Sequence, residues 1–323
     1  MIKHCIEKIK GRGTRIVFTE GSDARILEAA VRLHKEDILC PVLLGNRAEI
    51  LGAANALNLD VEGIEMLDPR EYKNMDMMVK KVVELRKGKM DEAMAREACM
   101  KTNFFGTMYV KLGCADGLLG GATYSTADTV RPALQLIKAR PGNSIVSSCF
   151  ILIRGEEHLV MGDCSINIDP SADDLVEITL QTAHTVRQFG IEPNVGLLSY
   201  STLGSAKGPS VDKVKEAATR LKRMPLDFGV EGELQFDCAV ASEVASLKAP
   251  ESKVAGNVNT FIFPNIDAGN IGYKIAARLG GYEAIGPILQ GLNAPINDLS
   301  RGCNTEEVYK MAIVTAAQKY MDI

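Results

Sequence analysis

The sequence predicts an α/β protein whose sheets are largely parallel and whose chain is divided into two domains. Short β-branched and aliphatic runs alternate with amphipathic helical stretches, which is the pattern of strands joined by crossover helices. A chain of 323 residues is also longer than a typical single domain. Pro141-Gly142 separates two halves that open with different patterns, so we place a domain boundary there.

The first half is expected to alternate strand and helix in regular order. In the stretch from Asp23 to His34, for example, Ile26, Leu27 and Leu33 share one helical face that would pack on a sheet. The predicted strands are 15–19, 40–45 and 62–67, and the predicted helices are 23–34, 48–57, 72–86, 91–109 and 127–139; the stretch 115–121 is apolar and glycine-rich.

The second half opens with two predicted strands, 144–153 and 158–168, which a short turn joins into a hairpin. Ser171 follows a break at Asp169-Pro170 and is suited to cap a helix. The remaining predicted strands are 194–200, 236–240, 260–264 and 286–290, and the remaining predicted helices are 171–189, 210–224, 270–279 and 305–320.

Composition and charge exclude several classes of partner. The net charge of −4, without any Lys/Arg-rich run, argues against binding to nucleic acid or to a membrane surface. No apolar run approaches the ~18 residues of a membrane span, and the N-terminal residues lack the apolar core of a signal peptide. The eight cysteines form no CxxC pair and the four histidines have no ligand spacing. We therefore expect no metal site and a reducing, cytoplasmic location.

Three loops place glycine, hydroxyls and a cation directly before a predicted helix, at 123–131, 201–208 and 267–274. The free N–H groups of a helix N-terminus can seat a phosphate. The candidate ligands in the first two loops are Ser125, Thr126, Arg131, Ser205 and Lys207. No loop matches GxxxxGK[ST], and none is a complete GxGxxG after a strand. The alternatives are ordinary helix capping and, for Arg131, a solvated surface cation.

The stretch 295–308 gathers the polar groups best suited to catalysis. It reads as a strand end, a glycine turn and a helix start, which is where open α/β sheets place their sites. Ser300 supplies a hydroxyl, Arg301 supplies a cation, and two carboxylates follow in the next helix. The alternative is structural, because Asn304 and Glu307 have the spacing of a capping box. No histidine has a Ser or Cys motif beside it, so the general base would be a carboxylate.

Six long segments, in order along nearly the whole chain, carry a family resemblance. They are 115–132 (ADGLLGGATYSTADTVRP), 165–170 (SINIDP), 201–207 (STLGSAK), 232–237 (GELQFD), 263–274 (FPNIDAGNIGYK) and 289–302 (LQGLNAPINDLSRG). Together they resemble the phosphate acetyltransferase (phosphotransacetylase) family. The resemblance implies reversible transfer of an acetyl group between coenzyme A and phosphate, giving acetyl phosphate. Coenzyme A would act as a substrate, and no cofactor is expected beside it.

The resemblance also implies a fold and an assembly. It implies two three-layer α/β domains of the isocitrate/isopropylmalate dehydrogenase-like topology, with a cleft between them, and a homodimer. In that family the C-terminal helix returns to the first domain. The first domain would then be residues 1–146 plus 294–323, and the second domain would be 147–293.

The resemblance assigns roles to individual residues. Ser300 would hydrogen-bond the thiol or the carbonyl oxygen, and Arg301 would hold the phosphate of acetyl phosphate. Arg278 would assist substrate binding. Arg86 and Arg131 would contact the anionic substrates, through the phosphates of coenzyme A.

The expected base is a carboxylate of a Glu-Asp pair, which in this chain reads Glu306-Glu307. Glu307 keeps the charge of the second position but is one methylene longer, and the sequence does not decide which of the two is the base.

Three alternative functions remain for comparison. A phosphate butyryltransferase would run the same chemistry on a longer acyl chain, and pocket volume would distinguish it. An acyl-CoA-sensing module would be fused to a catalytic partner, whereas we expect this chain to stand alone with Ser300, Arg301 and a carboxylate. A dehydrogenase of similar topology would need metal-binding aspartates and a nicotinamide site, and neither motif is found.

Overall fold

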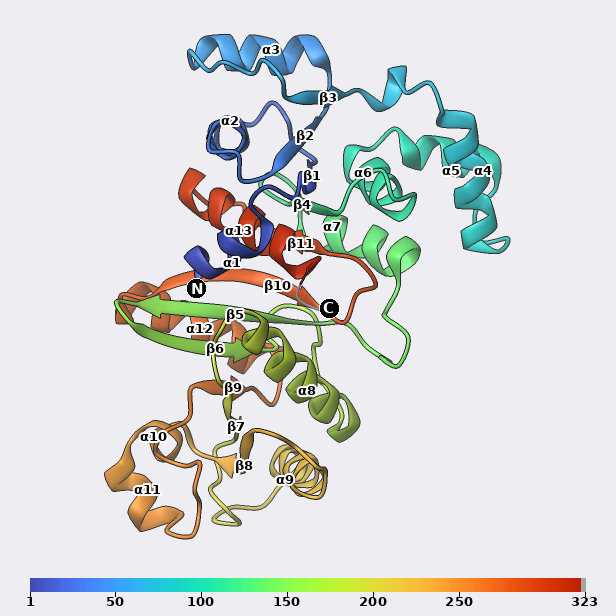
Figure 1. The fold of residues 1–323 in the computed structure, drawn as a ribbon. Helices are drawn as coiled ribbons and strands as arrows, with labels where there is room; N and C mark the ends of the chain where they lie inside the picture. Colours follow the sequence, from blue (N-terminus) through green and yellow to red (C-terminus); the bar gives the residue numbers. More distant parts are fainter. Residues whose placement is uncertain (321–323) are drawn as a thin grey trace. The chain divides into compact units, whose positions relative to one another are not determined.

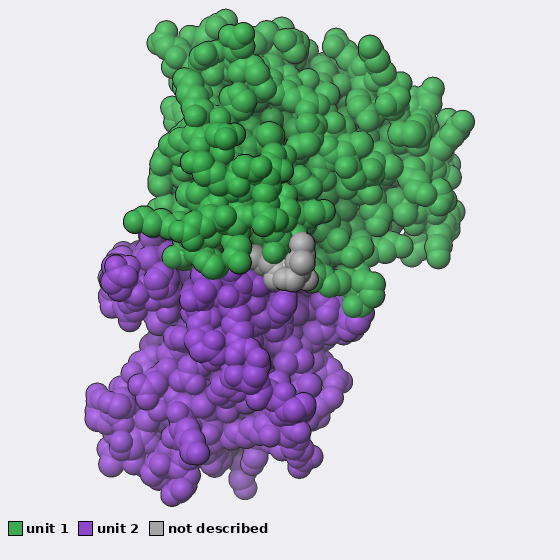
Figure 2. All heavy atoms as spheres, in the orientation of Figure 1, with its two compact units in different colours: residues 1–141, 292–323 green, residues 142–291 purple. Residues whose placement is uncertain are grey.

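The computed structural model describes residues 1–320 and forms two compact units (Figure 2). Unit 1 contains Met1–Pro141 and the segment from Leu292 onward, and unit 2 is Gly142–Gly291. The units therefore divide at 141/142 and 291/292, whereas the predicted domains divide at 146/147 and 293/294. The last three residues of the predicted segment 294–323 lie outside the described residues.

The sheet of unit 1 is parallel throughout, and its strand order is β11-β4-β1-β2-β3. The strands are β1 (Arg15–Phe18), β2 (Cys40–Leu44), β3 (Glu65–Leu67), β4 (Gly117–Gly120) and β11 (Ile296–Asp298). β11 comes from the C-terminal segment and adds to the sheet beside β4, with Asp298 opposite Gly120. This pairing brings residues near 300 to the carboxyl edge of a sheet built otherwise from the first 120 residues.

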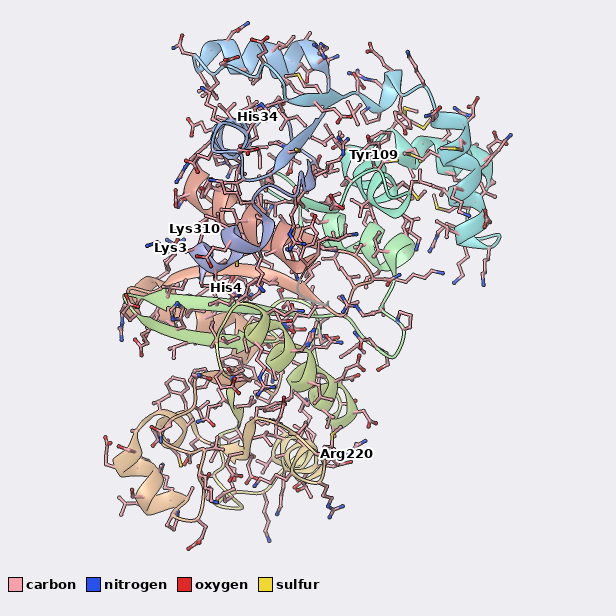
Figure 3. The ribbon with its side chains drawn as sticks, viewed as in Figure 1. Lys3, His4, His34, Tyr109, Arg220 and Lys310 are labelled. Atoms are coloured by element: carbon pink, nitrogen blue, oxygen red, sulfur yellow. The ribbon has the colours of Figure 1, made fainter. Side chains whose placement is uncertain are left out.

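Helices cover both faces of this sheet (Figure 1). They are α1 (Ile2–Ile9), α2 (Ala24–Lys35), α3 (Arg47–Ala56), α4 (Met75–Arg86), α5 (Glu92–Cys99), α6 (Thr102–Lys111), α7 (Thr126–Pro132) and α13 (Thr305–Gln318). Figure 3 shows Lys310 of α13 and Tyr109 of α6 on opposite sides of the sheet. Val17 and Leu118 face α6 at Gly106, whereas Ile16, next to Val17 in β1, lies with Thr315 of α13 near Gly117. Buried strands packed on two faces explain the near-continuous apolar runs in the sequence.

Two predicted helices of unit 1 are interrupted. The predicted helix 91–109 is two helices, α5 and α6, which a turn between Cys99 and Thr102 separates. The predicted helix 127–139 is α7 followed by a π-helical turn, Ala133–Ile137. Pro132 explains the second break, since it lacks the N–H that a continuous α-helix would use.

Unit 2 has a six-stranded mixed sheet in the order β10-β5-β6-β9-β7-β8. The strands are β5 (Ser147–Arg154), β6 (Glu157–Gly162), β7 (Asn194–Leu198), β8 (Gly229–Leu234), β9 (Thr260–Ile262) and β10 (Glu283–Gln290). The helices are α8 (Ala172–Gln188), α9 (Pro209–Lys222), α10 (Phe236–Val240), α11 (Ser242–Lys248) and α12 (Ile266–Gly280). β5 and β6 form the predicted antiparallel hairpin.

The predicted strand 236–240 is wrong, because these residues form α10. The strand lies just before it, in β8, which carries two glutamates and was not predicted. Both glutamates are buried and satisfied: Glu231 pairs with Lys222, and Glu233 accepts hydrogen bonds from the loop after β7. Buried glutamates interrupt the apolar pattern by which a strand is recognised in a sequence. Their partners are brought together only in the folded chain, so the pattern did not predict β8.

Candidate active site

The loop that follows β11 lies at the carboxyl edge of the unit 1 sheet and carries Ser300 and Arg301. The Leu299 N–H donates to the Gly120 carbonyl over 2.7 Å, so the loop starts beside β4. The Cys303 N–H closes the turn onto the Ser300 carbonyl at 2.9 Å. α13 then begins at Thr305 with Asn304 as its N-cap. The predicted strand end, glycine turn and helix start are confirmed.

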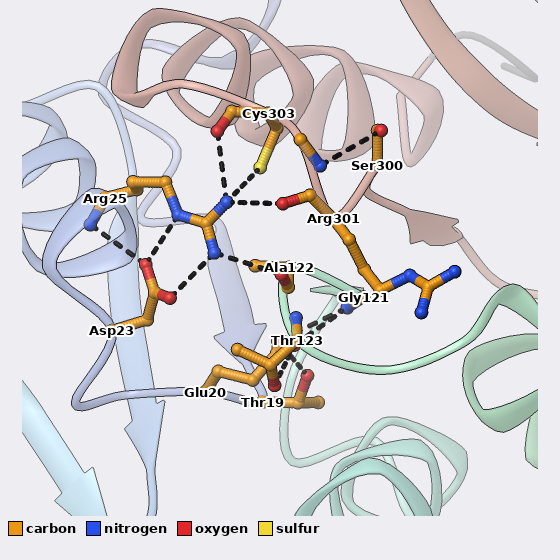
Figure 4. Close-up of polar contacts among 11 residues, drawn as sticks. Thr19, Glu20, Asp23, Arg25, Gly121, Ala122, Thr123, Ser300, Arg301 and Cys303 are labelled. Carbon is orange, nitrogen blue, oxygen red and sulfur yellow. Dashed lines mark hydrogen bonds and ion pairs between the residues drawn. The ribbon is translucent and has the colours of Figure 1, made fainter.

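Arg25 of α2 holds this loop in place, and the sequence analysis missed it. Its guanidinium donates to the carbonyls of Arg301 at 2.9 Å, Cys303 at 3.1 Å and Ala122 at 3.0 Å (Figure 4). Asp23 anchors the same guanidinium through both carboxylate oxygens, at 3.0 and 2.8 Å, and this contact lowers the pKa of Asp23. One planar cation thus joins three chain segments that are distant in sequence.

The loop after β4 has its own organiser in Glu20, a second residue that the sequence analysis missed. Glu20 follows β1 and is 9% exposed. Its carboxylate accepts hydrogen bonds from the Thr123 N–H at 2.8 Å, the Gly121 N–H at 3.2 Å and the Thr19 hydroxyl at 2.8 Å (Figure 4). A signal was present, since Glu20 comes directly after a buried strand, where the polar groups of α/β sites gather.

The predicted ligands Ser125 and Thr126 stand at the start of α7, and Arg131 lies exposed near its end. The Ser125 hydroxyl and N–H both donate to Asp128, at 2.6 and 3.3 Å, and the hydroxyl contact lowers the pKa of Asp128. Ser125 therefore does the capping that the sequence left as an alternative. A ligand role for these three residues stays a prediction.

The two candidate bases differ in their surroundings. The Glu306 carboxylate pairs with Arg32 of α2 at 2.7 Å and with Lys310 at 3.6 Å. Glu307 is half-buried and completes the capping box: its N–H donates to Asn304 Oδ1 at 2.9 Å, and its carboxylate accepts from the Asn304 N–H at 3.3 Å. The capping box is thus present. The Glu306 carboxylate is instead paired with one cation of α2, Arg32, and one of its own helix α13, Lys310.

Cys303 also lies in this loop and is buried. Burial raises the pKa of its thiol to about 11, although the Arg25 cation opposes the shift. The thiol is therefore protonated at neutral pH and is a poor nucleophile, since the thiolate is the reactive form.

Arg86 is the last residue of α4, and its Nε is buried without a hydrogen-bond partner within residues 1–320. A buried N–H of a cation without an acceptor is unfavourable in the protein alone. This observation is compatible with the predicted contact to an anionic substrate, which stays a prediction.

The remaining predicted ligands belong to unit 2. Ser205 and Lys207 lie exposed in the loop after β7, and Arg278 lies exposed in the last turn of α12. Buried Glu233 shapes the loop by accepting from the Ser201 hydroxyl at 3.0 Å and the Gly204 N–H at 2.6 Å. Seven of the predicted site residues therefore belong to unit 1, and Ser205, Lys207 and Arg278 belong to unit 2. The binding roles of Ser205, Lys207 and Arg278 stay predictions.

Metal and membrane features were searched over residues 1–320. Within that range, no three His, Cys, Asp or Glu side chains are grouped so as to hold a metal ion. Likewise, none of its helices combines the length and the apolar character needed to cross a bilayer.

Comparison with known proteins gives a concordant result. A protein-family model described as "Phosphate acetyl/butaryl transferase" matches residues 1–316. The chain belongs to this family. It is 52% identical over 312 residues to the "Phosphate acetyltransferase" of Bacillus subtilis (strain 168), with 97% of each chain covered. The predicted family resemblance is therefore confirmed.

Solved structures agree with the family and with the predicted fold class. A phosphotransacetylase from Streptococcus pyogenes superposes with a TM-score of 0.94 at 49% identity, covering 98% of this chain and 97% of that one. A putative 4-hydroxythreonine-4-phosphate dehydrogenase from Salmonella typhimurium superposes with a TM-score of 0.52 at 12% identity, covering 94% of this chain and 99% of that one. This likeness concerns the fold alone and confirms the dehydrogenase-like α/β class.

Proposed function

We propose that this chain is a phosphate acetyltransferase that interconverts acetyl-CoA plus phosphate with coenzyme A plus acetyl phosphate. The observation that carries the proposal is the family match over residues 1–316, together with 52% identity to a relative named phosphate acetyltransferase. The loop geometry supports it, because Arg25 fixes the backbone that presents Ser300 and Arg301.

In the proposed reaction, the thiol sulfur of coenzyme A attacks the acetyl carbon of acetyl phosphate. The acyl C–O bond breaks, phosphate leaves with the bonding electrons, and the thiol proton passes to a carboxylate, proposed as Glu307. Arg301 would hold the leaving phosphate, since a guanidinium matches phosphate oxygens bidentately. Ser300 would donate to the carbonyl oxygen or contact the thiol. Neutralisation by arginine means that the proposed reaction needs no cofactor beside its substrates.

The timing of proton transfer follows from ordinary acidities. A thiol has a pKa of ~8.5 and a glutamic acid one of ~4.3, so full deprotonation in advance would cost roughly 5.7 kcal/mol. Glu307 is only half-buried in unit 1. We therefore propose that Glu307 takes the proton while the sulfur attacks, as a general base does.

The experiment that tests the function follows thioester formation from coenzyme A with acetyl, propionyl and butyryl phosphate. We expect acetyl phosphate to give the highest kcat/KM. A preference for butyryl phosphate would replace the proposal with phosphate butyryltransferase. A purified chain that binds acetyl-CoA but transfers nothing would favour an acyl-CoA-sensing module.

Replacing Arg301 with alanine should chiefly weaken the binding of acetyl phosphate. Losing a charge-assisted contact of about 1.5–3 kcal/mol corresponds to a rise in KM for acetyl phosphate of roughly 10-fold to 100-fold. The KM for coenzyme A should change much less. Steady-state kinetics with each substrate varied in turn measure this, and an unchanged KM for acetyl phosphate would count against the role.

We also propose that the chain acts as a homodimer in the cytoplasm. The dimer is supported by an apolar stripe on α12, where Ile271, Ile275 and Leu279 are 58%, 54% and 85% exposed and spaced four residues apart. Such a contiguous stripe marks interaction surfaces. A mass near that of one chain in sedimentation equilibrium would contradict the dimer.

The proposed cytoplasmic location is supported by the eight free cysteines, which suit a reducing compartment.

A further inference from the structure

Asp298 is a buried acid that the proposed mechanism does not use. It is the last residue of β11, two residues before Ser300, and it is 1% exposed. Its Oδ1 is buried and has no hydrogen-bond partner within residues 1–320. Buried carboxylates normally have partners, so this atom calls for an explanation.

The space around Asp298 is shaped by its neighbours. Gly121 has a φ of +101°, and a Cβ at that position would lie 2.2 Å from Asp298 Oδ1. Only glycine can therefore carry the chain past this carboxylate. α7 supplies two hydroxyls, from Thr126 and Thr129. Thr129 Oγ1 is also buried without a partner in the described residues. The Thr129 hydroxyl, a donor, and Asp298 Oδ1, an acceptor, thus lie near each other, and neither has a hydrogen-bond partner within residues 1–320.

Asp298 is buried near one other carboxylate, that of Glu20. Burial raises the pKa of Asp298 to about 6, and the Glu20 carboxylate adds to this, while the Thr129 and Thr126 hydroxyls and the Leu299 N–H oppose it. The hydroxyls lower the pKa although neither forms a hydrogen bond of good geometry with Oδ1, so we regard the two contacts as incomplete. The charged side chains of α7, Asp128 and Arg131, are exposed.

The other elements against β11 are neutral at this point. α13 meets β11 through Thr315 and Gln318, whose side chains both accept from Asn297. The end of β4 and the residue after it bring Gly120 and Gly121 beside Asp298.

A buried acid of the second unit shows what a structural carboxylate looks like in this chain. Asp163 is 3% exposed, and its oxygens accept hydrogen bonds from the N–H groups of Ser165, Ile166 and Asn167 at 3.0–3.2 Å. The Asn167 side chain and the Ser148 hydroxyl donate as well. Both oxygens of this carboxylate therefore have donors. Asp298 lacks such a set of donors, and its raised pKa means that ionising it lowers the stability of the fold as pH rises from the ordinary value of an aspartic acid to about 6.

We propose that Asp298 is a positioning residue whose ionised carboxylate draws the Thr126–Thr129 turn of α7 onto the Ser300–Arg301 loop. α7 carries Ser125, Thr126 and Arg131, so Asp298 would set the spacing between the two groups of predicted ligands in unit 1. A buried acid that weakens the fold beside such a loop is expected to serve the reaction. This inference rests on the proposed function.

Asp298→Asn tests the charge at nearly constant shape. At pH 8 we expect kcat/KM to fall roughly 10-fold to 100-fold, as small misplacements of catalytic groups do. The wild-type profile of kcat/KM should fall below about pH 6, and the variant should lose this limb. The Tm of the variant at pH 8 should equal or exceed that of the wild type. The matched control, Asp163→Asn, should lower the Tm.

Thr129→Val tests the same contact from α7. Removing the hydroxyl should move the acid limb to higher pH, because the ionised carboxylate loses a donor. An unchanged limb in both variants, or a Tm loss in Asp298→Asn like that of Asp163→Asn, would overturn the proposal. An inactive wild-type chain would instead overturn the proposed function, so the two failures are distinguishable.

Discussion

Replacing Glu307 with glutamine should lower kcat by roughly 10²-fold to 10⁴-fold, the usual contribution of a general base. Glutamine can keep the N3 position of the capping box, because its side-chain oxygen can still accept the Asn304 N–H. It cannot take the thiol proton. We therefore expect a Tm within a few degrees of the wild type together with a large kinetic loss, measured by thioester formation at saturating substrates.

Glu306→Gln is the matched control, one residue away and on the same helix turn. It removes an exposed ion pair with Arg32, whose side chains are 45% and 49% exposed, and such pairs contribute about 0–1 kcal/mol. We expect its kcat to stay within several-fold of the wild type. If Glu306→Gln is the inactive variant and Glu307→Gln is active, the base is Glu306 and Glu307 serves only the capping box.

Replacing Arg25 with lysine should lower kcat/KM by roughly 100-fold while keeping the positive charge. The planar guanidinium reaches the carbonyls of Ala122, Arg301 and Cys303 as well as Asp23. An ammonium group is a point charge with three donors and cannot span these directions at once. The Ser300–Arg301 backbone should then lose its fixed place, and a displacement of about 1 Å can cost 10²-fold in rate.

Arg32→Lys is the control for this prediction, since Arg32 lies on the same helix and also contacts the last helix, through Glu306. Within residues 1–320 its side chain contacts Glu36, Glu306 and the Tyr309 ring rather than the loop, and it is 45% exposed, so kcat/KM should stay within several-fold of the wild type. Circular dichroism and Tm would verify that both variants are folded. A folded Arg25→Lys protein with near-normal kcat/KM would show that the loop holds its position without the guanidinium.

Local patterns predicted much of the architecture, because they depend on neighbours three or four residues apart or on alternation along a strand. Ser171 caps α8, and Asn304 with Glu307 forms the capping box of α13, as their spacing indicated. The predicted strand at 236–240 was wrong, because these residues form α10 and the actual strand has a sequence whose polar residues are paired only in the folded chain. The neighbouring strand β8 buries Glu231 and Glu233, whose partners Lys222 and Ser201 lie 9 and 32 positions away, beyond the alternation that marks a strand.

The sequence by itself determined the α/β class, the family and the stretch around Ser300 and Arg301. Motif order and hydrophobic period are properties of the chain alone. Only the tertiary structure decided what holds that stretch: Arg25 contacts residues 276 and 278 positions away, and Glu20 binds a loop about 100 positions away. It also decided that Asp298 is buried and that Glu306 is paired with α2. The reason is the strand order β11-β4-β1, which brings three distant carboxyl ends to one edge of a sheet.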